Sequence, residues 1–147
     1  MLKNTSAKIL VIDDDAGLTE LISVTLKTHG FDVVATNSGM EGVNLAKEKK
    51  PAVVILDLMM PDFDGWQVSK AIRAFSDAPI LILSAVSDPN MVASILDAGA
   101  DDFLIKPVPS NLLVAHVRKM VRQISAPVNI RPAVSASLPK KPPPLLS

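Results

Sequence analysis

The chain alternates short apolar runs with stretches of helical periodicity. The apolar runs are 8–12, 32–35, 52–56, 79–83 and 102–105. Three of them, 8–12, 52–56 and 79–83, are almost continuously apolar, which is typical of strands covered on both faces. Strands that alternate with helices favour right-handed crossovers and a parallel sheet between two helical layers. The pattern predicts an α/β fold with a single doubly wound, five-stranded parallel sheet of strand order 2-1-3-4-5.

Apolar residues spaced three and four apart predict the helices between these strands. The predicted helices lie around 18–26, 39–49, 68–75, 89–98 and 113–124. Leu21 is expected on the buried face of the first helix and Phe75 on that of the third. Asp15 and Ser38 are typical N-caps where the first two helices begin, and Gly30 is a typical residue just beyond a helix end.

Composition excludes several classes of function. The chain of 147 residues has no Cys and only two His, which lie in different segments, so thiolate and His-rich metal sites are excluded. Its 15 basic and 15 acidic residues balance, which argues against a nucleic-acid arm or a membrane-surface patch. We therefore expect no direct nucleic acid binding and no membrane contact. With no apolar run of the ~20 residues that span a bilayer and no signal peptide, a cytoplasmic location is expected.

Proline marks a change near residue 125. Residues 125–147 hold half of the 12 prolines, three basic residues and no acid. Proline at that density disfavours helix and sheet. We expect a folded domain over 1–124 and a Pro-rich flexible tail or linker over 125–147. The segment LPKKPPPLL could also be a polyproline ligand for an aromatic groove.

Polar side chains follow four of the five predicted strands. Asp13 and Asp14 follow the first strand, Asp57 the third, Ser84 the fourth and Lys106 the fifth. In an open parallel sheet the ligand site lies outside the carboxyl ends of the strands, at the point where strand order reverses. We therefore expect these side chains to line one rim of the sheet.

The chemistry of that rim points to a cation and a phosphoryl group. Two carboxylates about 4 Å apart repel by roughly 1 kcal/mol in water and about 4 kcal/mol at an effective dielectric of 20. A set of oxygen ligands without His or Cys favours Mg²⁺, with Mn²⁺ possible. Such a cation, Lys106 and the Ser84 hydroxyl would cradle a phosphoryl group, and an Asp carboxylate can accept that group as a nucleophile.

Four segments carry a resemblance to a known family, the receiver domain of two-component response regulators. They are ILVIDDD (9–15), ILDLMMPDFDGW (55–66), PILILSA (79–85) and GADDFLIKP (99–107). The resemblance covers residues 7 to about 124. It implies a phosphoacceptor switch that takes a phosphoryl group on Asp57 from a phosphohistidine in a Mg-dependent reaction. The donor would be a sensor histidine kinase or a phosphotransfer protein, and the altered surface would bind a downstream protein target.

The resemblance also implies a role for each residue of the rim. Asp14 and Asp57 would bind Mg²⁺, together with the backbone carbonyl of Met59, and Asp13 would act mainly through metal-bound water. Ser84 and Lys106 would bind the phosphoryl group. Phe103 would be the switch aromatic that turns inward as Ser84 moves. The loops of the site would be shaped by Pro61, by Gly65 and by Pro107, which would follow a cis peptide bond.

The sequence departs from the family pattern at several positions. Phe103 stands where Tyr is common, so no phenolic hydroxyl marks the inward state. Met59 and Val86 occupy positions that tune loss of the phosphoryl group, and because both are apolar we expect a long-lived phosphorylated state and slow self-dephosphorylation. His116 stands where an Arg commonly supports a homodimer through the face of helix 4, strand 5 and helix 5, which weakens the expectation of that dimer.

Rival interpretations remain at this point. A pseudo-receiver would be a protein-interaction module of the same fold that accepts no phosphoryl group. A phosphatase of the haloacid dehalogenase type could use Asp13 and Asp15, but it leaves Asp57 without a role and needs an acidic motif after Lys106 that the chain lacks. The chain is either stand-alone or the amino-terminal part of a longer regulator.

Overall fold

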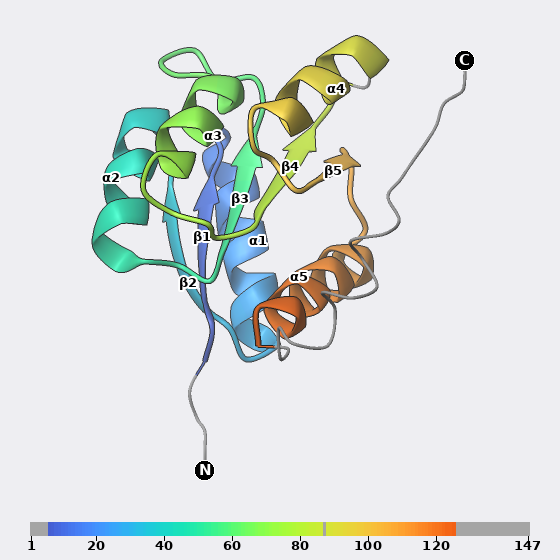
Figure 1. Ribbon diagram of the computed structural model, residues 1–147. Coiled ribbons are helices and arrows are strands. Elements are labelled where there is room, and N and C mark those ends of the chain that lie inside the picture. The colour runs from blue at the N-terminus through green and yellow to red at the C-terminus, as the bar shows by residue number, and fades with distance from the viewer. Residues whose placement is uncertain (1–5, 87, 126–147) are drawn as a thin grey trace, which may run out of the picture.

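The computed structural model describes residues 6–86 and 88–125. Within these residues, five parallel strands form one sheet of order β2-β1-β3-β4-β5, so the predicted fold class and strand order are confirmed (Figure 1). The elements are β1 (Lys8–Ile12), α1 (Ala16–Thr28), β2 (Asp32–Thr36), α2 (Gly39–Lys49), β3 (Val53–Asp57), α3 (Gly65–Arg73), β4 (Ile80–Ser84), α4 (Pro89–Asp97), β5 (Asp102–Ile105) and α5 (Ser110–Ser125).

The nearly continuous apolar runs form the three inner strands. β1 pairs with β2 and β3, and β4 pairs with β3 and β5. Every residue of β3 and β4 is buried, as the sequence predicts for strands covered on both faces. Both strands end one residue later than their apolar runs. Asp57 and Ser84 are therefore the last residues of β3 and β4 and are held by the sheet itself.

Two hydrophobic clusters cover the two faces of the sheet. Successive strand residues point to opposite faces, so Ile9 and Val11 belong to one cluster while Leu10 and Ile12 belong to the other. The first cluster packs against α1 and α5, and the second packs against α2, α3 and α4. Figure 1 shows the corresponding layers, with α1 behind the strands and α3 in front.

Side chains at the helix ends explain where the helices begin and stop. Asp15 accepts a hydrogen bond from the backbone N–H of Leu18, and Ser38 accepts one from that of Glu41, so both predicted N-caps are confirmed. Gly30 follows α1 with a φ of 94°, a conformation that favours glycine.

Two apolar residues lie outside the core that the helical pattern predicted. Leu21 is 59% exposed, because only Thr19, Ile22 and Leu26 of α1 are buried against the sheet. Phe75 lies beyond the end of α3 and is 38% exposed, with the Lys47 ammonium 5.1 Å from its ring centre. The segment predicted as a Pro-rich tail lies, from residue 126, outside the described residues. None of the described helices could span a bilayer.

Candidate functional site

Three carboxylates gather at the carboxyl ends of β1 and β3. Oxygen atoms of Asp13, Asp14 and Asp57 all lie within 4.8 Å of one another. Asp13 and Asp57 are 3% and 5% exposed, while Asp14 faces solvent. The backbone N–H of Asp15 donates to Asp13 Oδ1 at 3.0 Å, which orients that carboxylate. The acids that the sequence places after two different strands are thus neighbours in space.

Lys106, which follows the edge strand β5, brings a positive charge to this cluster. Its side chain reaches past the ends of β4 and β3. Its Nζ lies 2.8 Å from Asp13 Oδ2 and 3.4 Å from Asp57 Oδ1. The backbone N–H of Lys106 donates to the Ser84 carbonyl at 2.9 Å, and the Lys106–Pro107 peptide bond is cis. The cluster therefore holds three carboxylates and one ammonium, which contacts Asp13 and Asp57.

The proton affinities of the cluster reflect this imbalance. Burial, and then repulsion from Asp13, raise the pKa of Asp57 from 3.8 to about 6, although Lys106 opposes the shift. Burial works to lower the pKa of Lys106, but its hydrogen bond to Asp13 and the charges of Asp13 and Asp57 hold that pKa above its ordinary value. The carboxylates are crowded enough that a further cation would stabilise their ionised forms.

The donor set of the cluster suits a hard divalent cation. All the side-chain donors are carboxylate oxygens, and two of the three carboxylates are buried side by side. Mg²⁺ and Mn²⁺ prefer oxygen ligands and are commonly held by one or two carboxylates with water completing the coordination. The residues present therefore fit Mg²⁺.

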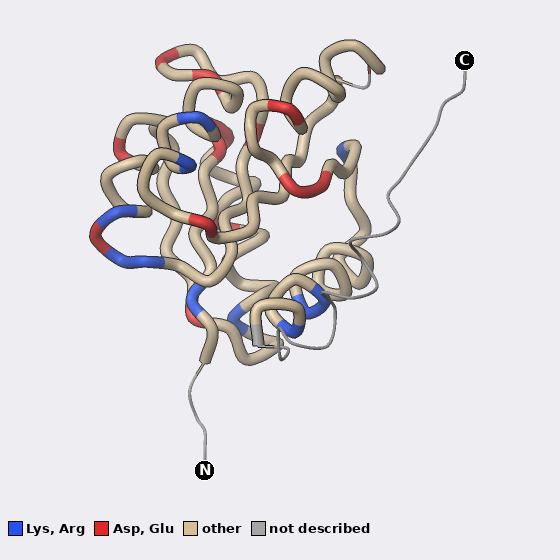
Figure 2. The backbone as a smooth tube through the Cα atoms, viewed as in Figure 1, with Lys and Arg blue, Asp and Glu red and all other residues tan. Residues whose placement is uncertain are grey.

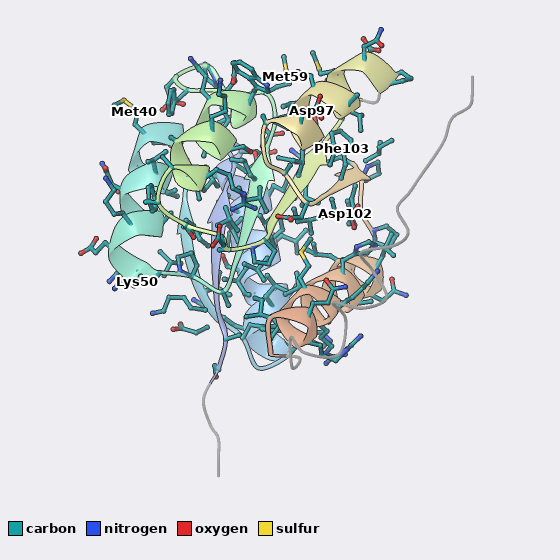
Figure 3. The ribbon with its side chains drawn as sticks, viewed as in Figure 1. Met40, Lys50, Met59, Asp97, Asp102 and Phe103 are labelled. Atoms are coloured by element: carbon teal, nitrogen blue, oxygen red, sulfur yellow. The ribbon has the colours of Figure 1, made fainter. Side chains whose placement is uncertain are left out.

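Ser84 and Phe103 lie on the two strands beside this cluster. Ser84 is fully buried, and its Oγ accepts a hydrogen bond from the backbone N–H of Val86 at 3.2 Å. Phe103 lies on β5, paired with Ile82 of β4, and packs partly buried against the hydrophobic cluster beneath α4. Figure 3 shows Phe103 on β5 below α4.

The loop between β3 and α3 closes over Asp57. The backbone N–H of Gly65 donates to the Leu58 carbonyl at 2.8 Å. A Cβ at Gly65 would lie 2.6 Å from the Asp57 carbonyl oxygen, so only glycine allows α3 to start this close to the strand. Pro61 and the side chain of Met59, which is 55% exposed, lie on the outer side of this loop. Figure 2 shows the acidic positions of the same loop in red, and Figure 3 shows Met59 at this upper end of the molecule.

One group of contacts at the site is not predicted by the sequence pattern. Functional residues were expected at the ends of strands one, three, four and five, yet the loop between β2 and α2 also contacts the loops that carry the acids. Asn37 donates to the Asp13 carbonyl at 2.8 Å, and Ser38 Oγ donates to Asp62 Oδ2 at 3.0 Å. The sequence signal, a short polar Asn–Ser–Gly segment after an edge strand, is too common to identify these contacts.

The geometry gives Asp15 no place in the acid cluster. Its side chain is used in capping α1, where it accepts from the Leu18 N–H at 3.1 Å. A dehalogenase-type phosphatase would need Asp13 and Asp15 to act together. In the structure, Asp13 instead faces Asp57 and Lys106.

Relatives of known sequence cover most of the described chain. The DNA-binding response regulator MtrA of Mycolicibacterium paratuberculosis is 40% identical over 116 residues, which are 79% of this chain and 52% of that protein. The probable transcriptional regulator ycf27 of Porphyridium aerugineum is 39% identical over 117 residues, which are 80% of this chain and 49% of that protein. The chain spans about half the length of the curated relatives it matches.

These relatives overturn one expectation. The prediction that nucleic acid is not a partner was wrong, because relatives at about 40% identity are DNA-binding response regulators. The prediction rested on the zero net charge of these 147 residues. This chain aligns with only about half of each relative, so its net charge says nothing about DNA binding by the other half of those proteins.

Solved structures and the family match agree on the fold. A crystal structure of a two-component response regulator from Clostridium difficile superposes with a TM-score of 0.80 at 26% identity, covering 82% of this chain and all of that one. The BeF3-activated N-terminal receiver domain of Klebsiella pneumoniae RstA gives a TM-score of 0.75 at 31% identity, covering 79% and 99%. The sequence model of the response regulator receiver domain matches residues 9–118. With its acid cluster at the expected end of the sheet, the chain belongs to the receiver domain family of two-component response regulators.

Proposed function

We propose that Asp57 is the phosphoacceptor of this receiver domain and takes its phosphoryl group from a phosphohistidine of a sensor histidine kinase or phosphotransfer protein. One observation carries the proposal: the Asp57 carboxylate is buried at the end of a central strand, with two other carboxylates and the Lys106 ammonium around it. An oxygen of Asp57 forms the new P–O bond while the P–N bond to the imidazole breaks. The imidazole keeps the bonding electron pair. A cytoplasmic location, where such donors work, fits this role.

The surrounding residues hold and orient the reacting groups. Asp13, Asp14, Asp57 and the backbone carbonyl of Met59 would hold Mg²⁺, which when bound offsets the negative charge of the carboxylates and of the transferring group. The Lys106 ammonium lies close enough to Asp57 to pair with a phosphoryl oxygen. The domain is a regulatory phosphoacceptor whose self-phosphorylation by small phosphodonors depends on Mg²⁺.

The phosphoryl group changes the surface by moving Ser84. In the structure the Ser84 hydroxyl only accepts a hydrogen bond from the backbone N–H of Val86, two residues further along the chain, so it can turn toward a new acceptor at Asp57. Inverting a switch from 1:99 to 99:1 needs about 5.5 kcal/mol of differential binding. Charge-assisted hydrogen bonds contribute roughly 1.5–3 kcal/mol each, so two or three bonds to Ser84, Lys106 and a loop amide suffice. Phe103 follows Ser84 inward.

The phosphorylated state is proposed to last long. Met59 is exposed beside the site and Val86 flanks Ser84, and neither side chain can hydrogen-bond an attacking water. The decay of purified phosphoprotein tests this proposal. A half-life of seconds would overturn it, and a Met59→Asn variant should decay faster than the parent.

The relatives support a role in transcription. MtrA is a DNA-binding response regulator, and ycf27 is a probable transcriptional regulator. We infer that phosphorylation of this domain controls DNA binding in the protein to which it contributes. Retarded migration of operator DNA that depends on Asp57 is the expected result for the natural full-length protein.

The deciding experiment is intact mass measurement after incubation with acetyl phosphate and Mg²⁺. The unaltered protein should gain the mass of one phosphoryl group, and Asp57→Ala should gain none. No gain in the unaltered protein would favour a pseudo-receiver that only binds partners. A gain that persists in Asp57→Ala would assign the acceptor to another aspartate.

A further inference from the structure

The loop between β2 and α2 contributes no acid to the cluster but contacts it through the backbone. The Asn37 side-chain amide donates to the carbonyl of Asp13 at 2.8 Å and to Thr19 Oγ1 at 3.1 Å. In the opposite direction, the backbone N–H of Asp13 donates to the Thr36 carbonyl at 3.2 Å. The β1–α1 loop, which carries Asp13 and Asp14, is thereby tied to the β2–α2 loop.

The same loop also holds the β3–α3 loop. Ser38 Oγ donates to Asp62 Oδ2 at 3.0 Å, and the backbone N–H of Gly39 donates to the same oxygen at 3.1 Å. Desolvation acts to raise the pKa of the exposed Asp62, but these hydrogen bonds and those from the backbone of Met40 and Phe63 together lower it. In Figure 3, Met40 at the start of α2 and Met59 in the β3–α3 loop lie at the same end of the molecule.

The β2–α2 loop is itself well anchored. Thr36 is buried, and its hydroxyl donates to the Glu41 carboxylate while accepting from the backbone N–H of Ser38. A Cβ at Gly39 would lie 2.4 Å from the Phe63 carbonyl oxygen, so α2 begins in direct contact with the β3–α3 loop. The loop can therefore serve as a fixed reference for its two neighbours.

We propose that the β2–α2 loop is a bracket that sets the spacing of the metal ligands, with Asn37 holding the β1–α1 loop and Ser38 holding the β3–α3 loop through Asp62. The proposal rests on the proposed function, in which the β1–α1 loop supplies Asp13 and Asp14, the β3–α3 loop supplies the Met59 carbonyl, and Asp57 is the last residue of β3. Mutual repulsion pushes the ionised Asp13, Asp14 and Asp57 apart, and the bracket opposes that displacement. Because Mg²⁺ demands near-octahedral geometry with short bonds, a small displacement of either loop weakens its binding. Asn37, Ser38 and Asp62 are positioning residues in this scheme, since none is a ligand.

Two variants each remove the contacts of the β2–α2 loop with one neighbouring loop, and the chain offers a matched control for each. Asn37→Ala removes the tie to Asp13, and Asn44→Ala removes an exposed amide from the middle of α2. Asp62→Ala removes the tie to Ser38 and Gly39, and Asp97→Ala removes an exposed carboxylate at the end of α4. Asp62→Asn keeps an oxygen acceptor for both donors and should restore part of the function.

The first readout is Mg²⁺ affinity, followed through the fluorescence of Trp66, which lines the same hollow as Met59. Titrations are made with MgCl₂ at a temperature where circular dichroism shows every variant fully folded. Asn37→Ala and Asp62→Ala should each bind Mg²⁺ about tenfold more weakly, as typical for loss of residues that orient metal ligands. The two controls should match the unaltered protein, and Asp62→Asn should lie between. Unchanged affinity in both bracket variants would overturn the proposal.

The second readout separates the bracket from the proposed function. Without Mg²⁺, amide hydrogen exchange reports on the N–H groups of Asp13 and Asp15, which bond to Thr36 and to the Asp13 carboxylate. Faster exchange of these amides in Asn37→Ala, with Asn44→Ala unchanged, is the expected result. Failure of the unaltered protein to bind Mg²⁺ would overturn the proposed function and the metal-spacing proposal together. Unchanged exchange at these amides would overturn the bracket alone.

Discussion

The Lys106 ammonium lies closer to Asp13 than to the proposed phosphoacceptor. Its distance is 2.8 Å to Asp13 Oδ2 and 3.4 Å to Asp57 Oδ1. Asp13 is also a candidate metal ligand, so Lys106 and a bound cation compete for the same carboxylate. Once Asp57 carries the proposed phosphoryl group, we expect a phosphoryl oxygen to be the stronger partner of Lys106, because it carries more charge than a shared carboxylate.

Replacement of Lys106 should therefore have opposite effects on metal binding and on phosphorylation. Lys106→Met removes the competitor for Asp13, and we expect Mg²⁺ to bind about tenfold more tightly, which corresponds to about 1.4 kcal/mol. Loss of a charge-assisted hydrogen bond of roughly 1.5–3 kcal/mol should slow phosphorylation by acetyl phosphate at least tenfold. Fluorescence titration and intact mass measure the two effects, and Lys49→Met, at an exposed position of α2, is the control. Weaker Mg²⁺ binding in Lys106→Met would contradict the competition.

The raised pKa of Asp57 predicts that its ionised form lowers the free energy of unfolding, by an amount that depends on pH. The folded protein binds the Asp57 proton up to about pH 6, whereas the unfolded chain releases it near 3.8. Stability from this group is therefore fully present below about pH 4 and is lost as the pH rises through 6. In metal-free buffer at pH 8, Asp57→Asn should be more stable than the unaltered protein by at most about 3 kcal/mol, since each pKa unit is worth 1.36 kcal/mol.

Urea unfolding from pH 4 to pH 8 measures this difference. The gain of Asp57→Asn should shrink as the pH falls from 6 to 4. Asp97→Asn, at an exposed position, should show no such trend. A gain that stays constant across the range would mean that burial, rather than ionisation, accounts for the effect.

The contrast between predicted and missed features has a physical basis. The strand order and the end of the sheet that carries the site follow from local signals, namely apolar runs that end in polar residues such as Asp57 and Ser84. The Asn37–Asp13 and Ser38–Asp62 bonds each join residues 24 positions apart, and no local signal pairs them. Exposure of Leu21 depends on how α1 is rotated about its own axis against the sheet. Helical periodicity does not fix this rotation to better than about one residue.

Arg73 shows the same kind of long-range contact on the opposite side of the domain. Its guanidinium donates to the Gly99 carbonyl at 3.0 Å, to the Ala78 carbonyl at 2.7 Å and to the Asp101 carboxylate at 2.6 Å. Asp101 also accepts from the backbone N–H of Ile80, the first residue of β4. Arg73 thus joins the end of α3 to the loops that enter β4 and β5.

Loss of this network should destabilise the fold without disturbing the acid cluster. We expect Arg73→Met to lower the free energy of unfolding by about 2–4 kcal/mol, because several carbonyls and Asp101 lose a charged donor. Arg118→Met, at an exposed position of α5, should change it by less than about 0.5 kcal/mol. The network lies where β4 and β5 begin, so Mg²⁺ affinity should stay unchanged. A change in affinity under folded conditions would link this region to the site.

α3 begins in close contact with β3, the strand that ends at the proposed phosphoacceptor. A Cβ added at Gly65 would lie 2.6 Å from the Asp57 carbonyl oxygen and 2.7 Å from Leu58 Cα, so backbone must shift. Gly65→Ala should lower the free energy of unfolding by about 1–3 kcal/mol, as overpacking does. Gly17 offers the matched control, because its added Cβ would meet only Asp15 Oδ1 at 3.5 Å, an ordinary contact. Gly17→Ala should raise stability by up to about 1 kcal/mol, since alanine favours helix over glycine.

Urea unfolding of the two alanine variants decides whether close packing or helix propensity governs the start of α3. The bond from the Gly65 N–H to the Leu58 carbonyl is 2.8 Å long, and a shift of α3 would lengthen it beside Asp57. We therefore expect Gly65→Ala also to be phosphorylated more slowly under conditions in which it is fully folded, while Gly17→Ala keeps the parental rate. Equal stability of the two variants would show that the β3–α3 loop yields to the added methyl group, and the loop could then not hold the Asp57 backbone in place.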